Sequence, residues 1–305
     1  MSEAKASGGW KLWAVLALPP LFWAGNFIVA RYSRGEWPPV SLAYGRWVIA
    51  LIALLPFAWP HLKRDWPLYK RYFWRIVGLS VPGVVAFNTL IYWGLQTTPA
   101  TNGMLLNSSI PLLILLIGAL FWGQRLGLWQ VLGLIVSTLG VAVVILQGSL
   151  ARALALDFAQ GDLIIFTAMI AWAFYTMGLK LFPPEVNRIG LLAVQIILAL
   201  PMLAPFLALE LWLGYRPIFT PASIASLAYI GIVPSVLAYL FYTRAVVLAG
   251  PARAGQFIHL IPVYGAILSA AFLHEPLHLY HAAGFGLILG GILLAAQGNR
   301  AAAKG

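Results

Sequence analysis

The chain has 305 residues, of which 62% are hydrophobic and 9% are charged, and its formal net charge is +11. Soluble globular domains carry about 25% charged residues, so the composition excludes a soluble globule and predicts an integral membrane protein. The absence of cysteine excludes disulfides and thiolate-bound metals. The 19 Lys and Arg residues are dispersed along the loops, so we expect no nucleic-acid partner.

Ten apolar stretches reach the length of about 20 residues that a helix needs to cross a bilayer. They are expected at 11–32, 38–59, 73–95, 102–122, 128–147, 163–182, 189–213, 223–248, 253–273 and 280–296. The first is longer than the apolar region of a secretory signal, and no small-residue cleavage site follows it before Arg31, so we interpret it as a retained span. The sequence thus predicts an all-α polytopic membrane protein with ten transmembrane helices.

Basic residues are distributed unevenly between the two sides of this bundle. With a cytoplasmic N-terminus, only Arg31, Arg34, Arg152 and Arg216 fall outside, and Arg46 lies within a span. Because cytoplasmic loops are enriched in Lys and Arg, we predict that both termini are cytoplasmic and that the membrane is a bacterial inner membrane.

The two sets of five spans share sequence at a nearly constant spacing of about 150 residues. The Trp-Ala step at Trp23 matches the one at Trp172, and Pro111 matches Pro262. The predicted repeats are 1–150 and 151–305. Because each repeat has an odd number of spans, the second runs through the membrane in the opposite direction. Inverted repeats place the substrate near the midplane at interrupted helices, here around a central cavity.

The fourth span contains a polar interruption that ends in Pro111. Proline has no backbone N–H, so the carbonyl of Asn107, four residues earlier, loses its usual partner. Lipid supplies no hydrogen bonds, so such a group persists only against another helix or a water-filled cavity. We therefore expect Asn107 to face His259 across a cavity, with Pro111 and Pro262 as hinges.

Polar and aromatic side chains within the spans are the candidates for substrate binding. They are Asn26, Tyr44, Arg46, Asn88, Tyr92, Asn107, Trp172, Tyr175, Gln195, Tyr239, Tyr242, Gln256, His259 and Tyr264. Amides bind carboxylate and ammonium groups, and aromatic faces stack on rings, so the set suits an aromatic amino acid. The alternative is that these residues only pack and form interhelical hydrogen bonds, worth about 0.6 kcal/mol each.

Arg46 matches Gln195 in the second repeat, so a charge in one half replaces an amide in the other. From its place in the span, Arg46 is expected to extend outward and pair with Glu36 or a carbonyl. The sequence favours this structural role over binding of a substrate carboxylate.

All Asp and Glu residues fall in or near loops. A proton-coupled antiporter needs a buried carboxylate, so we predict passive or weakly coupled transport. His259 is then the one mid-span side chain that titrates near neutral pH.

The run from His274 to His278 has the letters of the H-E-x-x-H zinc motif, with His281 nearby. That motif needs both histidines on one helix face, and Pro276 is expected to start a new helix between them. We therefore predict a loop between the ninth and tenth spans, without a metal or another cofactor. A membrane metalloenzyme at 274–281 stays the alternative.

Small residues at four-residue spacing occur at Gly133 and Ser137 in the fifth span and at Gly286 and Gly290 in the tenth. They permit close approach of helix backbones, so we predict that these two spans form a scaffold. Nothing in them indicates dimerisation, and a monomer is expected.

Two five-helix halves that each begin with a Trp-Ala step resemble the drug/metabolite transporter superfamily in its ten-helix EamA form. Arg46, the prolines of the fourth and ninth spans and the glycine-rich fifth and tenth spans support this resemblance. In overall similarity the chain resembles the YddG-like exporters of aromatic amino acids. The family's glutamate before the fifth and tenth helices appears as Gln124 in the first repeat and as Glu275 in the second.

The resemblance implies a basket-like bundle, alternating access and outward movement of small metabolites across the lipid bilayer. The leading hypothesis is an exporter of amino acids with aromatic or hydrophobic side chains and no enzymatic activity. An exporter of other metabolites or cationic drugs, and a non-transporting structural subunit, are the further alternatives.

Overall fold

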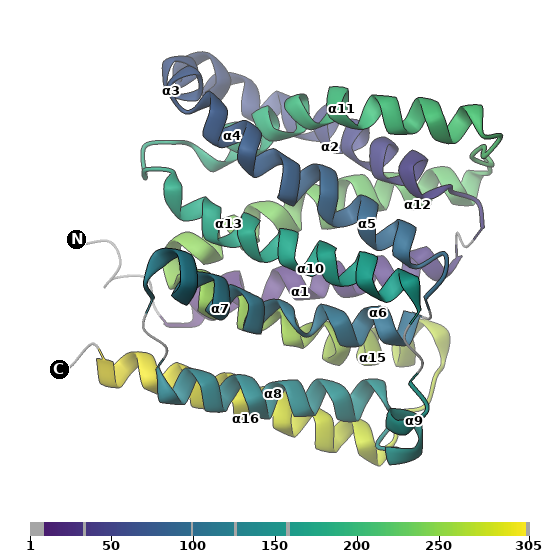
Figure 1. The fold of residues 1–305 in the computed structure, drawn as a ribbon, viewed down its shortest axis with the longest axis vertical. Helices are drawn as coiled ribbons and strands as arrows, with labels where there is room; N and C mark the ends of the chain where they lie inside the picture. The colour runs from purple at the N-terminus through teal and green to yellow at the C-terminus, as the bar shows by residue number, and fades with distance from the viewer. Residues whose placement is uncertain (1–8, 33–34, 99, 125–126, 157–158, 303–305) are drawn as a thin grey trace.

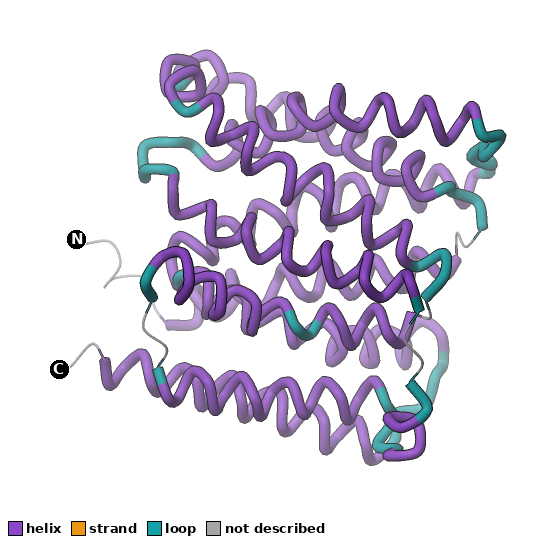
Figure 2. The backbone as a smooth tube through the Cα atoms, in the orientation of Figure 1, coloured by secondary structure: helices purple, strands orange, loops and turns teal. Residues whose placement is uncertain are grey.

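The structure is a computed structural model that describes residues 9–32, 35–98, 100–124, 127–156 and 159–302. The first half contains α1 (Gly9–Tyr32), α2 (Pro39–Arg64), α3 (Trp66–Arg71), α4 (Phe73–Ser80), η2 (Val81–Ala86), α5 (Phe87–Gly94), α6 (Ala100–Asn107), α7 (Ile110–Trp122) and α8 (Leu128–Ile145). The second half contains α10 (Gln160–Gly178), η3 (Leu179–Leu181), α11 (Arg188–Trp212), α12 (Pro221–Ile232), η4 (Val233–Leu237), α13 (Ala238–Ala249), α14 (Pro251–Gln256), η5 (Phe257–His259), α15 (Leu260–Leu273) and α16 (Leu279–Ala302). The short α9 (Leu150–Leu154) lies between the halves, and Figure 2 shows only helices and loops in the described residues.

The predicted spans agree with these helices to within a few residues at most ends. Nine stretches of the described chain are long and apolar enough to cross a membrane, and they correspond to the second to tenth predicted spans. The first predicted span forms α1, which has 24 residues and packs against α13 and α15. The fold is therefore the predicted all-α polytopic membrane bundle.

The helices run back and forth along one common direction (Figure 1). α1 begins and α16 ends at the same end of the bundle, which we call the termini face, and the other end is the opposite face. α3 lies at the termini face and α9 at the opposite face.

The fourth and ninth spans are both broken just before their prolines. In the fourth, α6 ends at Asn107 and α7 begins at Ile110, with the amides of Ser108 and Ser109 bonded three residues back to Leu105 and Leu106. In the ninth, the 3-10 segment η5 separates α14 from α15. The two breaks occupy equivalent places in the two repeats. At each break, backbone groups inside the bundle lack their usual helical partners, and only protein or water can form hydrogen bonds with them.

α8 and α16 form a closely packed antiparallel pair along one edge of the bundle (Figure 1). A Cβ added at Gly140 would meet the Gly284 carbonyl at 2.8 Å, and one added at Gly291 would meet the Gly133 carbonyl at 2.5 Å. The predicted Gly133 is thus at the contact, and Ser137 is fully buried.

In the tenth span, the predicted glycines, Gly286 and Gly290, are not the ones that contact the fifth span. A Cβ added at Gly286 or Gly290 would meet nothing within 4 Å, so these residues lie away from α8. Gly286 and Gly290 are four residues apart and Gly284 and Gly291 are seven apart. Both spacings keep a pair on one helix face, and the rotation of α16 decides that Gly284 and Gly291 face the partner helix.

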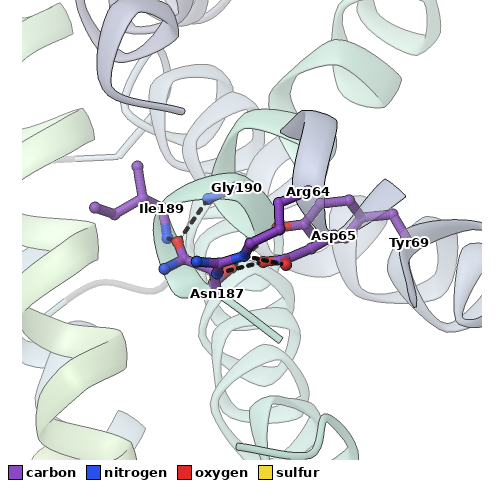
Figure 3. Close-up of polar contacts among 6 residues, drawn as sticks. All are labelled: Arg64, Asp65, Tyr69, Asn187, Ile189 and Gly190. Atoms are coloured by element: carbon purple, nitrogen blue, oxygen red, sulfur yellow. Dashed lines mark hydrogen bonds and ion pairs between the residues drawn. The ribbon is translucent and has the colours of Figure 1, made fainter. Parts of the chain in front are cut away.

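A polar cluster at the termini face joins the two halves (Figure 3). Asn187 caps α11 by accepting hydrogen bonds from the amides of Ile189 (2.9 Å) and Gly190 (3.2 Å), and Tyr69 donates to the Asn187 carbonyl at 3.4 Å. Beside it, the hydrogen bond from Arg64 (2.7 Å) holds the pKa of Asp65 below its usual value. This pair therefore contributes to stability above the unfolded-state pKa, and the contribution is lost as the pH falls through the lower folded-state value.

Candidate functional site

Arg46 lies inside the bundle rather than at its edge, with 2% of its surface exposed. Its Nε donates to the Ser235 hydroxyl at 2.8 Å, and its Nη1 donates to Asn88 Oδ1 and to the Tyr92 hydroxyl, both at 2.7 Å. The expected pairing of Arg46 with Glu36 is wrong, because the side chain extends toward α5 and η4 and Glu36 accepts from Thr220 instead. Arg46 is therefore a buried cation whose hydrogen-bond partners are all neutral.

The Arg46 network continues across the boundary between the repeats. Asn88 Nδ2 donates to the hydroxyl of Tyr239 at 3.2 Å, and that hydroxyl donates to the Gly83 carbonyl at 2.8 Å. Asn88 and Tyr239 occupy equivalent positions in the two repeats, 151 residues apart, and they meet here.

Two π-helical segments supply backbone acceptors to this network. η2 and η4 occupy matching places, and each contains a Val-Pro step, at Pro82 and Pro234. One carbonyl in each segment accepts a hydrogen bond from a tryptophan side chain. Trp47 donates to the Val84 carbonyl at 3.0 Å, and Trp23 donates to the Pro234 carbonyl at 3.2 Å. π-Helical turns shift the backbone bonding pattern and are frequent at functional sites. The repeated Val-Pro step in the sequence could have predicted the positions of η2 and η4.

Aromatic side chains fill the centre of the bundle around Trp172. The ring centroids of Trp23, Tyr175, Tyr239 and Tyr242 lie 5.4, 5.1, 5.3 and 5.3 Å from that of Trp172. Trp23 and Trp172 are the repeated tryptophans, and they meet at an interplanar angle of 85°. Where we predicted a central cavity, the structure shows these rings in mutual contact, and Trp23, absent from our candidates, is one of them.

Four candidates carry buried polar atoms that have no hydrogen-bond partner within the described chain. The atoms are Trp172 Nε1, the Tyr175 hydroxyl, Gln195 Nε2 and Asn26 Oδ1. Each such group costs about 1–3 kcal/mol, and native proteins rarely leave them without a functional reason. Three of the four can donate and one only accepts, which is a suitable set for a ligand that carries both an anionic and a cationic group.

His259 forms a second polar cluster, between the fourth, fifth and ninth spans. Its Nε2 lies 3.0 Å from the carbonyl of Ser108 and its Nδ1 lies 2.8 Å from the hydroxyl of Ser137. Because a carbonyl only accepts, Nε2 carries a proton and donates to Ser108. The Ser137 hydroxyl lies within hydrogen-bond distance of Nδ1 and donates to the Leu134 carbonyl at 3.0 Å. Asn107 was expected to face His259 across a cavity. The structure instead shows a direct contact between the two broken helices, made by the Ser108 carbonyl.

The remaining candidates have lesser roles in these clusters. Tyr242 shares a hydrogen bond of 3.0 Å with Thr176, and Gln256 donates to the Gly291 carbonyl at 3.1 Å. In the described chain, Tyr44, Asn107 and Tyr264 are half-buried and their side chains make no hydrogen bond. The hinge candidates differ in exposure, since Pro111 is buried and Pro262 is half-buried.

A cleft of about 470 Å³ opens at the termini face. Its lining includes Gln124, Gln130, Lys180 and Arg253. A small cavity of about 10 Å³ shares Gln130 and Arg253 with this lining and is also lined by Pro111, Leu134 and Gln256. Pro111 follows Ser108 by three positions, and Leu134 and Gln256 precede Ser137 and His259 by three, which is about one helical turn. This small cavity therefore lies close to the His259 cluster.

Glu210 and Asp162, two of the buried carboxylates, accept hydrogen bonds at helix starts. Glu210 accepts from the amides of Val40 (2.8 Å) and Ser41 (2.7 Å) at the start of α2, and Asp162 accepts from the Ala159 amide at 2.7 Å. Both lie near the opposite face, as expected for residues near loops.

The His274 motif does not lie on one helix. α15 ends at Leu273, His274 has a left-handed backbone (φ 54°), and α16 begins only at Leu279. This confirms the predicted loop, but the expected helix start at Pro276 is wrong, because the loop continues through His278. No cluster of three His, Cys, Asp or Glu side chains in the described ranges is arranged to hold a metal ion.

Gly83 allows the ring of Tyr175 to pack on η2, and its substitution gives a prediction. A Cβ on Gly83 would overlap the ring of Tyr175, whereas one on Gly78 would meet nothing within 4 Å. We expect Gly83→Ala to destabilise the protein by about 1–3 kcal/mol through overpacking and to impair function, with Gly78→Ala near wild type. Thermal unfolding in detergent measures the difference, and equal melting temperatures for the two variants would contradict it.

The fold and the site define a multi-pass membrane protein built from two copies of a five-helix unit, with repeat-related polar and aromatic residues meeting at its centre. The family described as the EamA-like transporter family matches residues 10–146 and 159–297. The chain belongs to this family, within the drug/metabolite transporter superfamily, and is a transporter rather than an enzyme.

Individual relatives agree with this assignment. The chain is 28% identical to an uncharacterized transporter, YyaM, of Bacillus subtilis over 90% of each protein. It is 24% identical to a probable terminal-alkyne amino-acid exporter of Streptantibioticus cattleyicolor, over 87% of this chain and 86% of the relative. A solved structure titled only "Crystal structure of protein" matches with a TM-score of 0.75 and 20% identity, over 95% of this chain and 98% of that chain, which shows the fold.

Proposed function

We propose that the protein exports amino acids with aromatic or hydrophobic side chains, as a monomer that alternates access between repeats 1–150 and 151–305. The observation that carries the proposal is the Arg46 guanidinium. Within the described chain its Nη2 has no acceptor, and no carboxylate contacts it. A buried charge without a counter-ion is costly in a membrane protein, and a substrate carboxylate supplies the missing negative charge.

The other groups of the site suit the rest of an amino acid. Asn26 Oδ1 is an unoccupied acceptor for an ammonium group, and the Tyr175 hydroxyl and Gln195 Nε2 are further donors for a carboxylate. The rings around Trp172 provide faces against which a hydrophobic or aromatic side chain packs. The sequence favoured a structural role for Arg46 because a pairing with Glu36 was expected. Without that pairing, the argument for a purely structural role no longer applies.

The charge bias and the cleft support outward transport. We take the termini face as cytoplasmic because most Lys and Arg residues lie there, in a bacterial inner membrane. The cleft opens to that side, with Lys180 in its lining as a cation for an incoming carboxylate. The relative described as a probable amino-acid exporter supports outward movement of this substrate class.

Transport is passive or weakly coupled in this proposal. Glu210 and Asp162 accept hydrogen bonds from helix-start amides near the opposite face, and this structural role supports the absence of a carboxylate for proton coupling. A pH jump alone is therefore expected not to drive accumulation of amino acid in proteoliposomes. Robust uphill uptake after the jump would contradict this part of the proposal.

Counterflow tests the substrate class. Proteoliposomes are loaded with one unlabelled compound at a time, and uptake of labelled tyrosine is followed. We expect tyrosine, phenylalanine and leucine to stimulate uptake, and tyramine, which lacks the carboxylate, to do so poorly. Liposomes without protein provide the baseline. If no amino acid stimulates uptake while a cationic drug such as ethidium is transported, the amino-acid proposal fails in favour of drug export.

A further inference from the structure

A basic and aromatic corner lies at the termini face where α2, α3 and α4 meet, on the side of the bundle farthest from α8 and α16 (Figure 1). We call it the α3 corner. It comprises the cations Lys63, Arg64, Lys70, Arg71 and Arg75 and the aromatic residues Trp66, Tyr72 and Trp74. It is separate from the Arg46 and His259 clusters, and the transport proposal does not use it.

The corner has five cations and one acid, so positive charge is in excess. Its acid, Asp65, is already occupied by Arg64 through bonds of 2.7 and 3.0 Å. Arg71 and Arg75 both lie over the ring of Tyr72, with 5.8 and 5.3 Å between guanidinium carbon and ring centroid. Neither contacts a carboxylate in the described ranges. Two like charges at one ring repel each other, so an anion bound between them is favoured.

The two guanidiniums are oriented by the protein. Tyr72 packs against Phe182 with 6.2 Å between ring centroids, and Arg75 donates from Nη1 to the Leu181 carbonyl at 3.3 Å. Partly fixed side chains lose less entropy when they bind. Arginine is also the residue whose fork of donors matches the oxygens of a phosphate.

Exposed tryptophans place the corner at the level of lipid headgroups. Trp74 is 79% exposed and Trp66 is 51% exposed, and the Lys70 ammonium lies 5.6 Å from the centroid of the Trp66 ring. Large exposed indole rings beside cations at the end of a membrane bundle are typical of the interface between hydrocarbon and headgroups. The available anion at that depth is a phospholipid phosphate.

We propose that the α3 corner binds the headgroup of an anionic phospholipid from the leaflet at the termini face, with Arg71 and Arg75 as the phosphate ligands. Lys70 adds charge, and Trp66 and Trp74 flank the acyl chains. A general bias of basic residues toward one side orients a protein without selecting a lipid, so lipid selectivity is the property that distinguishes a site from that bias.

Thermal unfolding of the full-length protein in detergent tests the proposal. Phosphatidylglycerol is expected to raise the melting temperature by several degrees more than phosphatidylcholine at the same concentration. The Arg71→Gln/Arg75→Gln variant should lose this difference. The matched control, Arg152→Gln/Arg216→Gln, removes two exposed cations near the opposite face and should keep it.

Three results would contradict the lipid-binding proposal. Equal shifts with the two lipids, retention of the difference in Arg71→Gln/Arg75→Gln, or the same shift with inorganic phosphate would each overturn the proposal. If that variant does not fold, native mass spectrometry of the wild-type protein in an equal mixture of the two lipids decides. Preferential retention of phosphatidylglycerol supports the site, and equal retention overturns it.

Discussion

Replacing Arg46 with Gln is expected to raise the apparent KM for tyrosine about 100-fold, because loss of a buried charge-assisted contact costs about 2–5 kcal/mol. The flux of tyramine should change little, since the amine presents no carboxylate to the guanidinium. The substitution also removes the donor that joins Asn88 to Ser235, so the melting temperature should fall by a few degrees. Flux in proteoliposomes and thermal unfolding measure the two effects separately.

Arg216→Gln is the matched control, because Arg216 is exposed near the opposite face. It should leave both KM and melting temperature at wild-type values. An Arg46→Gln protein that is destabilised but transports tyrosine with a normal KM would show that Arg46 is purely structural. That result would remove the observation on which the amino-acid proposal rests.

Replacing Gly291 with Ala is expected to destabilise the protein by about 3 kcal/mol. The added methyl group would lie 2.5 Å from the Gly133 carbonyl and 2.6 Å from the Ser137 amide nitrogen. Backbone atoms cannot rotate away, so α8 and α16 must separate, and overpacking of this kind reaches the upper part of its usual range. The separation also strains the hydrogen bond from Gln256 to the Gly291 carbonyl.

The neighbouring glycine provides the control. Gly290→Ala adds the same methyl group one residue earlier, where nothing lies within 4 Å, and it should unfold at the wild-type temperature or slightly above it, since Ala favours helix more than Gly. Thermal unfolding of both variants in one detergent makes the comparison. A Gly291→Ala protein as stable as Gly290→Ala would mean that the two helices do not pack this closely.

Much of the candidate site could be predicted from polar residues within spans. Arg46, Asn88, Tyr92 and Tyr239 form one network, and the breaks before Pro111 and Pro262 lie where the sequence placed them. A polar group in hydrocarbon needs a partner or water, so its presence in an apolar span is itself informative.

Other parts of the site could not be predicted because backbone groups carry no signature in the sequence. The acceptors at Gly83, Val84 and Pro234 exist because η2 and η4 are π-helical, and the partner of His259 is the carbonyl of Ser108. Periodicity also did not show whether Gly290 or Gly291 faces α8, since the rotation of a helix that is apolar on all sides is set by packing.

The sequence by itself determined the membrane class, the ten spans and the two-fold repetition, because hydrophobic length and internal similarity are local or one-dimensional properties. The tertiary structure alone decided which repeated residues meet. Asn88 reaches Tyr239 and Trp23 reaches Trp172 only once the two halves pack together. It also decided that Arg46 is buried among neutral partners rather than paired with Glu36, because the direction of a side chain from a helix depends on the neighbours that exclude lipid from it.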